Sequence, residues 1–286
     1  MRIPFVKAQA AGNDFVLVEE ATAGVHDWSA LARAICDRHF GVGGDGLLVL
    51  SRVAEADFRM RMFNPDGSED TCGNGLRCAV RYVVERGWTR GEEIVALTRS
   101  GRQRCRLHAD GRVTVTLGRA SFSPTAIPAR TDVPELVGAL LRSPEGDLRI
   151  TSVSTGTAHT ILFGDPPDDD RFVRISRWLE THPLFPERTS VLWATPRGAN
   201  RYVARIWERG VGETLACGTG AAAIAAAAIR LGQATSPVVV HSRGGALEVG
   251  VSDEFDLWLT GPAEEVFSGE FRLPEAVHDG TEPAGA

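Results

Sequence analysis

The 286-residue chain contains two kinds of strongly apolar segment, one alternating and one continuous. Residues 58–63 (FRMRMF) and 202–207 (YVARIW) alternate between apolar and polar positions, which predicts strands with one buried face. Residues 217–231 instead have almost no polar face, and residues 76–86 have only a thin one. A helix without a polar face is buried, so we expect a sheet that curls around a central helix, twice.

Two further segments have the spacing of surface helices. Residues 27–38 (DWSALARAICDR) are predicted as a helix that Asp27 or Ser29 caps, and residues 133–142 (VPELVGALLR) as another. Downstream of each apolar helix we expect two strand-like runs joined by a turn, with Asp110–Gly111 as one hairpin signal.

The two halves of the chain repeat each other at an offset of 145 residues. Residues 72–75 (CGNG) fall on residues 217–220 (CGTG), and Gly87 falls on Gly232, just past each apolar run. Each half has the order strand, glycine-rich turn, apolar helix, hairpin. The shared order and spacing predict two related domains.

We place the boundary between these domains near residue 120. The N-terminal half is residues 1–119, and residues 266–276 are expected to pack back onto it. The C-terminal half is residues 120–265. Residues 277–286 lack periodicity and are expected to form a loose tail.

Composition and charge exclude several classes of partner. The formal net charge of −6 argues against nucleic acid, and no run of 18 apolar residues predicts a membrane span. The N-terminal segment lacks the apolar region of a signal peptide. An odd count of five cysteines argues for reduced thiols in the cytoplasm, and the lack of a CxxC pair argues against structural zinc.

Each apolar helix begins with a cysteine and two glycines. The first N–H groups of a helix have no intrahelical partner and carry the positive end of its dipole, so an anion fits there. A cysteine at this position has its thiolate favoured. Cys72 and Cys217 therefore each predict an anion site with a reactive thiol beside it.

Two matched thiols suit proton removal on one face of a carbon and proton return on the other, which racemises or epimerises an α-amino acid. A racemase that uses pyridoxal phosphate needs a lysine for the Schiff base. Lys7, in an N-terminal strand-like segment, is the only lysine, so a mechanism without this cofactor is favoured. A cysteine hydrolase is the main rival, but it gives the second thiol no role. The glycine-rich residues 41–46 (GVGGDG) lack the ending of a phosphate loop.

The same residues carry a family resemblance. NPDGSEDTCGNGLRC (64–78) and ERGVGETLACGTGAAA (208–223) resemble the two cysteine signatures of the diaminopimelate epimerases. The segments AGNDFVLVE (11–19), HFGVGGDGLLVL (39–50), STGTAHTILF (154–163) and HPLFPERTSV (182–191) are similar to other segments of that family. The resemblance runs in order from about residue 5 to about residue 265.

This resemblance implies a fold and an activity. The fold is α/β (α+β), with two pseudosymmetric domains, each a barrel-like mixed sheet around a central apolar helix, and an active site in the cleft between them. The activity is conversion of LL- to meso-diaminopimelate in lysine and cell-wall synthesis. It needs no cofactor and no metal, takes a small amino acid as its partner, and is expected in a homodimer.

The resemblance also implies roles for particular residues. Cys72 and Cys217 are the two bases, and His159 lies near the thiols and helps to set their protonation. The reacting carboxylate is held by backbone N–H groups of Gly73, Asn74, Gly218 and Thr219. The rest of the substrate is contacted by Asn13 and Glu208 at its reacting amino group and by Asn64, Thr157, Ser190 and Arg209 at its far end.

Two positions depart from the family pattern. Where these enzymes usually have Gly-Asn-Pro-His, residues 156–159 read Gly-Thr-Ala-His, and where they have Arg-Thr-Asn, residues 188–190 read Arg-Thr-Ser. Thr157 and Ser190 are shorter than asparagine, and each offers one donor instead of two. Three readings stay open: epimerisation of diaminopimelate, racemisation of another amino acid such as histidine, and a thiol hydrolase or non-catalytic amino-acid-binding protein.

Overall fold

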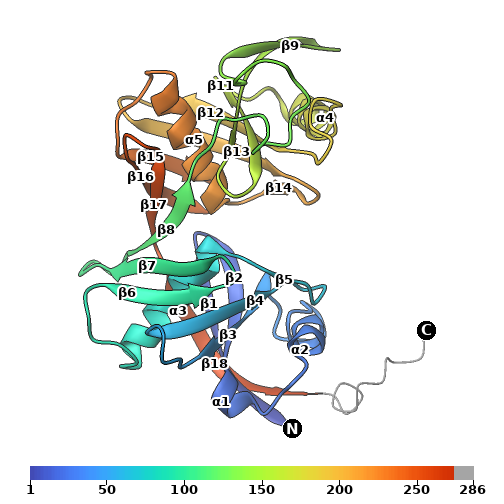
Figure 1. Cartoon of the computed structure of the whole chain (residues 1–286). Helices are drawn as coiled ribbons and strands as arrows, with labels where there is room; N and C mark the ends of the chain where they lie inside the picture. Colours follow the sequence, from blue (N-terminus) through green and yellow to red (C-terminus); the bar gives the residue numbers. More distant parts are fainter. Residues whose placement is uncertain (274–286) are drawn as a thin grey trace, which may run out of the picture. The chain divides into compact units, whose positions relative to one another are not determined.

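The computed structural model describes residues 1–273, which form two compact units (Figure 1). Unit 1 comprises residues 1–115 and the segment that returns to it at Pro262, and unit 2 comprises residues 116–261. The returning segment thus begins four residues before the predicted 266. The predicted tail, residues 277–286, and the last residues of the predicted returning segment lie outside the described residues.

The described part of unit 1 contains three helices, and most of its strands lie in the first 119 residues. The elements are β1 (Arg2–Ala10), β2 (Asn13–Glu19), α1 (Glu20–Ala23), α2 (Trp28–Ile35), β3 (Gly46–Ser51), β4 (Phe58–Phe63), β5 (Glu69–Asp70), α3 (Gly73–Glu85), β6 (Ile94–Thr98), β7 (Gly101–Leu107), β8 (Val113–Arg119, which ends in unit 2) and β18 (Glu264–Arg272). Its strands pair in the order β18, β1, β2, β3, β4, β6, β7, β8, with β5 beside β4.

Unit 2 repeats this arrangement. Its elements are β9 (Ala139–Ser143), β10 (Gly146–Ser154), β11 (Ala158–Phe163), α4 (Asp169–Glu180), β12 (Ser190–Pro196), β13 (Arg201–Glu208), β14 (Gly212–Thr214), α5 (Gly218–Arg230), β15 (Val238–Ser242), β16 (Gly245–Val251) and β17 (Asp256–Gly261). The strands pair in the order β9 to β13, then β15, β16 and β17, with β14 beside β13.

Two parallel strand pairs in each unit explain where the helices lie. The pairs β2–β3 and β4–β6 are parallel in unit 1, as are β11–β12 and β13–β15 in unit 2, and the other neighbours run antiparallel. A parallel pair needs a crossover, and here each crossover carries a helix: α2 and α3 in unit 1, α4 and α5 in unit 2. The mixed sheets and the internal repeat confirm the predicted fold class.

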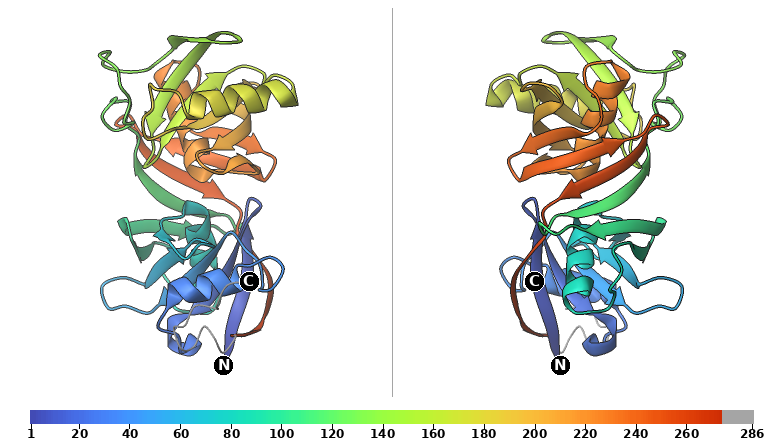
Figure 2. Two further views of the ribbon diagram at one scale, coloured as in Figure 1. Left: turned by 90° about the vertical axis from the view of Figure 1, so that its right-hand side faces the viewer. Right: turned by 90° about the vertical axis from the view of Figure 1, so that its left-hand side faces the viewer.

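Helices α2 and α3 cover opposite faces of the sheet in unit 1, and α4 and α5 do so in unit 2. In β3, Leu47 and Val49 pack against the α2 side, while Leu48 faces Gly75 of α3. Figure 2 shows α4 along the outside of unit 2, where Phe172, Ile175 and Leu179 join the same apolar cluster as β12 and β13. Strands covered on both faces are apolar throughout, which is why residues 46–50 do not alternate.

The helices α3 and α5 are the predicted central helices, and their bounds differ by the predicted offset of 145 residues. Helix α5 contacts β10, β11, β12, β15, β16 and β17, so the sheet curls around it. Ten of its thirteen residues are buried, most of them alanine. Small side chains fit because a helix enclosed by strands has little room around it.

Two local predictions were wrong. Residues 133–142 do not form a helix, because Gly138 takes the left-handed φ of +62° and the next five residues form β9, which pairs with β10. Each predicted downstream hairpin of two strands has three: β6, β7 and β8 in unit 1, and β15, β16 and β17 in unit 2. The Asp110–Gly111 turn joins β7 and β8.

No helix among residues 1–273 is long and apolar enough to cross a membrane.

We expect Ala225→Leu to destabilise the protein by roughly 1–3 kcal/mol, because Ala225 is fully buried in α5 and a larger side chain overpacks its surroundings. The measurement is the free energy of unfolding from urea titration. The exposed Ala21→Leu substitution in α1 is the control. Equal stability of the two variants would contradict tight packing around α5.

Candidate active site

Cys72 is the N-cap residue of α3. Its backbone is extended, with φ −149° and ψ 114°, and its Sγ accepts a hydrogen bond from the Gly75 N–H at 3.3 Å. A Cβ on Gly75 would lie 2.9 Å from Leu48 Cδ2, so glycine lets the first turn approach the sheet. The thiol thus partners one of the N–H groups that the helix cannot satisfy itself.

Cys217 caps α5 in the same way. Its φ is −136° and its ψ is 116°, and its Sγ accepts from the Gly220 N–H at 3.3 Å. The Thr219 hydroxyl lies 3.4 Å from this sulfur. A Cβ on Gly220 would lie 3.2 Å from Leu192 Cδ2, which again explains the glycine. The predicted repeat therefore extends to the atoms around each thiol.

Two side-chain amides, those of Asn13 and Asn74, lie beside Cys72. The Asn13 side-chain oxygen lies 4.0 Å from the Cys72 sulfur and accepts a hydrogen bond of 3.1 Å from Asn74 Nδ2. The other end of the Asn13 amide donates to Asp45 Oδ2 at 2.5 Å. The oxygen of the buried Asn74 amide has no partner among the described residues. Asn64 lies directly after β4, where its amide donates to Ser68 at 3.0 Å.

A charged cluster stands behind Asn13. Arg38 Nη2 donates to Asp45 Oδ1 at 2.7 Å and to Asp14 Oδ1 at 2.8 Å. Lys7 forms an ion pair of 2.5 Å with Asp14. Burial by itself would raise the pKa of Asp14, but hydrogen bonds from Arg38 and Lys7 outweigh it and lower the pKa to about 2. The Asp14 carboxylate is therefore ionised at neutral pH.

A carboxylate, rather than an amide, lies near Cys217. Burial, followed by the negative charge of Glu208, raises the pKa of the Cys217 thiol. The Thr214 hydroxyl donates to Glu208 Oε1 at 2.6 Å, and the Thr155 hydroxyl donates to the Thr219 carbonyl at 3.0 Å. At neutral pH Cys217 is therefore a neutral thiol that is only 7% exposed.

His159 lies on β11, directly opposite Ser190 of the parallel strand β12. Its Nε2 is 3.0 Å from the Thr157 hydroxyl, and its Nδ1 has no hydrogen-bond partner among the described residues. Burial, followed by the positive charge of Arg209, lowers the pKa of His159 to about 3. The imidazole is therefore neutral at physiological pH.

Glu208 is the last residue of β13, and Arg209 follows it in the turn to β14. The backbone N–H of Arg209 donates to Ser190 Oγ at 3.1 Å, and its guanidinium donates to the Glu187 carbonyl at 3.1 Å. The buried carboxylate of Glu180 accepts from Trp207 Nε1 at 2.7 Å and from the Gly210 N–H at 2.8 Å. Glu180 thus holds both ends of the turn.

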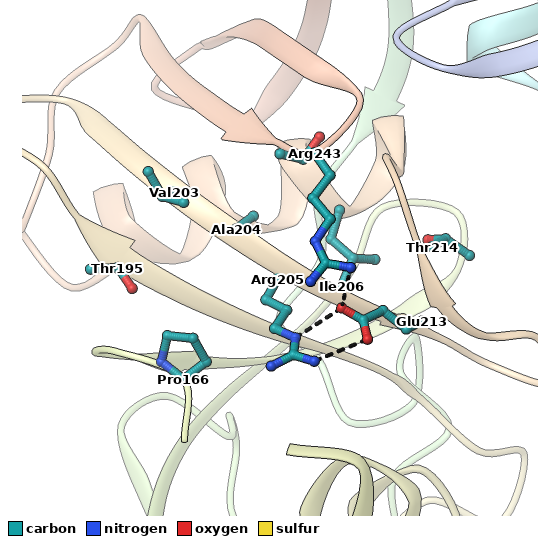
Figure 3. Close-up of a pocket in the computed structure, with 10 residues that line it drawn as sticks. Pro166, Thr195, Val203, Ala204, Arg205, Ile206, Glu213, Thr214 and Arg243 are labelled. Atoms are coloured by element: carbon teal, nitrogen blue, oxygen red, sulfur yellow. Dashed lines mark hydrogen bonds and ion pairs between the residues drawn. The ribbon is translucent and has the colours of Figure 1, made fainter. Parts of the chain in front are cut away.

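A pocket in unit 2 lies between β12, β13 and β14, where Glu213 pairs with Arg205 and Arg243 (Figure 3). Its lining includes Thr214 but neither Cys217 nor Glu208. Among the described residues, no group of three or more histidine, cysteine, aspartate or glutamate side chains could hold a metal ion.

Comparison with known proteins decides the family. The model of the family described as diaminopimelate epimerase matches residues 5–123 and 151–266. A diaminopimelate epimerase of Desulforudis audaxviator is 41% identical over 273 residues, which cover 93% of this chain and 98% of that protein. One of Azoarcus sp. is 42% identical over 278 residues, which cover 96% and 100%. The chain belongs to the diaminopimelate epimerase family.

Solved structures of more distant proteins share the fold of this family member. A probable proline racemase from Agrobacterium radiobacter matches with a TM-score of 0.68 at 15% identity, over 96% of this chain and 95% of the other. A hydroxyproline epimerase from Agrobacterium vitis matches with a TM-score of 0.67 at 15% identity, over 94% and 92%. At this identity the likeness shows the architecture alone.

In this member of the diaminopimelate epimerase family, some predicted residues contact one another around Cys72 in unit 1, and others lie around Cys217 in unit 2. Asn13 and Asn74 contact each other beside Cys72, and Thr219 contacts Cys217. Sequence analysis missed Asp45 and Glu180. The sequence does contain a sign of the role of Glu180, because a carboxylate at the buried end of an amphipathic helix needs a hydrogen-bond partner.

We expect iodoacetamide to alkylate Cys72 at least about tenfold faster than Cys217 at pH 7, because the reagent attacks thiolates and each unit by which burial raises a thiol pKa lowers the thiolate fraction tenfold. Cys72 is half-buried, whereas Cys217 is buried with a raised pKa. Peptide mass spectrometry over time measures both rates. Cys36, Cys78 and Cys105, whose pKa values burial raises to about 12, are internal references. Equal rates at the two caps would contradict this difference.

Proposed function

We propose that this protein epimerises LL-diaminopimelate to meso-diaminopimelate without a cofactor, with Cys72 and Cys217 as its two acid/base groups. Family membership supports the substrate and the reaction. The observation that carries the mechanism is the pair of equivalent thiol caps, each 3.3 Å from the N–H of the third helical residue. One thiol acts on each face of the α-carbon.

In the proposed reaction, one thiolate takes the α-proton as the Cα–H bond breaks and an S–H bond forms. The other thiol then gives its proton to the opposite face of the carbanion, which forms a new Cα–H bond with inverted configuration. The two sulfur atoms exchange protonation states, and no electrons enter or leave. The reverse reaction uses the same groups in exchanged roles.

The surroundings of the thiols suggest their resting states. Burial and the charge of Glu208 favour a neutral Cys217, which suits the role of proton donor in the first turnover. Cys72 then serves as the base for the isomer that binds first. Release of the product leaves the opposite arrangement, which is ready for the other isomer.

The substrate carboxylate is held by helix N-termini in this proposal. The N–H groups of Gly73 and Asn74 in one unit, and of Gly218 and Thr219 in the other, belong to first turns that have no intrahelical acceptors. Anions bind favourably at such positions. The same dipoles stabilise negative charge that develops next to the carboxylate when the α-proton leaves.

Other predicted residues orient the rest of the substrate. Asn13 Oδ1 and the Glu208 carboxylate accept hydrogen bonds, as contact with an ammonium group requires. Arg209, whose guanidinium suits a carboxylate, binds the far end with Asn64, Thr157 and Ser190. His159 is a neutral group that orients Thr157 rather than a source of positive charge.

We also propose a cytoplasmic location and a homodimeric state. All five cysteines are free, which suits a reducing compartment. The homodimer rests on the family resemblance alone.

Alanine at either cap should reduce the rate of epimerisation by at least roughly 10²–10⁴-fold, because one face of the α-carbon loses its acid/base group. The measurement is conversion of LL-diaminopimelate, with loss of the α-proton in heavy water followed by NMR. Cys36→Ala removes a buried thiol outside the caps and is the control. Turnover that survives Cys72→Ala or Cys217→Ala would overturn the two-base scheme.

Restoring asparagine at both departures, Thr157→Asn with Ser190→Asn, should lower the KM for diaminopimelate by roughly fivefold, as one added hydrogen bond would. The same heavy-water screen includes L-histidine. Exchange on histidine, with none on diaminopimelate in either protein, would instead support racemisation of another amino acid. Exchange on no amino acid would favour a hydrolase or a binding protein.

A further inference from the structure

The glycine-rich segment 41–46 lies behind the Cys72 half of the site and does not bind phosphate. The N–H groups of Val42 and Gly43 both donate to the Ile35 carbonyl, and that of Gly44 donates to the Cys36 carbonyl. These acceptors belong to the C-terminal end of α2, the negative end of a helix. The donors that a phosphate loop would offer are therefore already used.

The glycines of this segment serve its packing instead. A Cβ on Gly41 would lie 2.3 Å from the Ala34 carbonyl oxygen, and Gly43 has a φ of +80°. The segment can therefore fold back over the end of α2. Its Asp45 N–H donates to the Asp14 carbonyl at 2.7 Å, which fixes Asp45 beside the start of β2.

The Asp45 carboxylate is surrounded by donors. One oxygen accepts from Asn13 Nδ2 at 2.5 Å and from the Asp14 N–H at 3.1 Å, and the other accepts from Arg38 at 2.7 Å. An ionised carboxylate can only accept hydrogen bonds. It therefore dictates which end of the Asn13 amide faces it.

A side-chain amide has a donor end and an acceptor end of nearly the same shape. With its NH₂ group on Asp45, Asn13 must turn its oxygen toward Cys72 Sγ and Asn74 Nδ2. The flipped amide would place oxygen against the Asp45 carboxylate and NH₂ against the NH₂ of Asn74. Both contacts would be repulsive.

We infer that Asp45 is a positioning residue, which holds the Asn13 amide so that its oxygen faces Cys72 and the reacting amino group. The contact with the amino group rests on the proposed function. The contact with Cys72 does not, because the structure contains it.

The test is Asp45→Asn in the full-length protein. An amide at position 45 can present either end, so Asn13 is free to flip and offer NH₂ to an ammonium group that needs an acceptor. The KM for diaminopimelate should rise roughly tenfold, the effect of one lost hydrogen bond to a charged group, with a smaller change in kcat. In an Asn13→Ala background the same substitution should add nothing.

Alkylation of Cys72 gives a second readout that does not depend on the substrate. A flipped NH₂ group can donate to the thiolate, so iodoacetamide should modify Cys72 faster in Asp45→Asn while epimerisation becomes slower. General loosening of the fold would instead speed the reaction of the buried Cys78 and Cys105 as well.

Asp57→Asn is the matched control. The Asp57 carboxylate likewise accepts hydrogen bonds from both a side chain and the backbone in unit 1, from the Thr89 hydroxyl at 3.0 Å and the Val95 N–H at 2.8 Å, but neither of these bonds involves Asn13 or Cys72. It should leave the KM and the alkylation of Cys72 unchanged.

The outcomes separate the two proposals. If Asp45→Asn matches Asp57→Asn in both readouts, or its effect adds in full to that of Asn13→Ala, the role of Asp45 is overturned. If the wild-type protein shows no α-proton exchange but Asp45→Asn still speeds alkylation of Cys72 alone, the role of Asp45 stands and the proposed function falls.

Discussion

The need to satisfy N–H groups at the start of a buried helix shapes both halves of this protein. Helices α3 and α5 are enclosed by strands, so water is a poor partner for their first turns. A cysteine sulfur accepts one N–H in each case, and glycine at the third helical position allows the turn to approach the sheet. The same arrangement places a thiol beside N–H groups that attract an anion. Packing and chemistry therefore have one cause.

The two caps are alike in backbone and differ in what surrounds them. Cys72 faces the amides of Asn13 and Asn74, whereas Cys217 lies near the carboxylate of Glu208. Duplication explains the likeness, because the helix bounds differ by the same 145 residues as the cysteines. The differences are Asn74 in α3 against Thr219 in α5, Asn13 at the start of β2, and Glu208 at the end of β13. An epimerase can use such asymmetry, since its two acid/base groups must begin a turnover in opposite protonation states.

A buried or partly buried carboxylate supports each half of the site from the side of the outer helix. Asp45 follows α2 and holds Asn13, and Glu180 ends α4 and holds the turn that follows Glu208 and carries Arg209. Both carboxylates accept only N–H donors from the groups they hold. An ionised carboxylate only accepts hydrogen bonds, so each of the two fixes the orientation of the N–H groups that it contacts.

The sequence alone determined the repeat, the central helices and the thiol caps. These features are local: apolar runs without a polar face, and a cysteine with two glycines at a helix start, keep their meaning wherever the chain folds. The tertiary structure alone decided that residues 133–142 contain a strand, since pairing with β10 and the left-handed Gly138 override helical spacing. It also decided the roles of Asp45 and Glu180. Their partners are Asn13, which is 32 residues away, and Gly210, which is 30 residues away, and contacts over such separations depend on the sheet register.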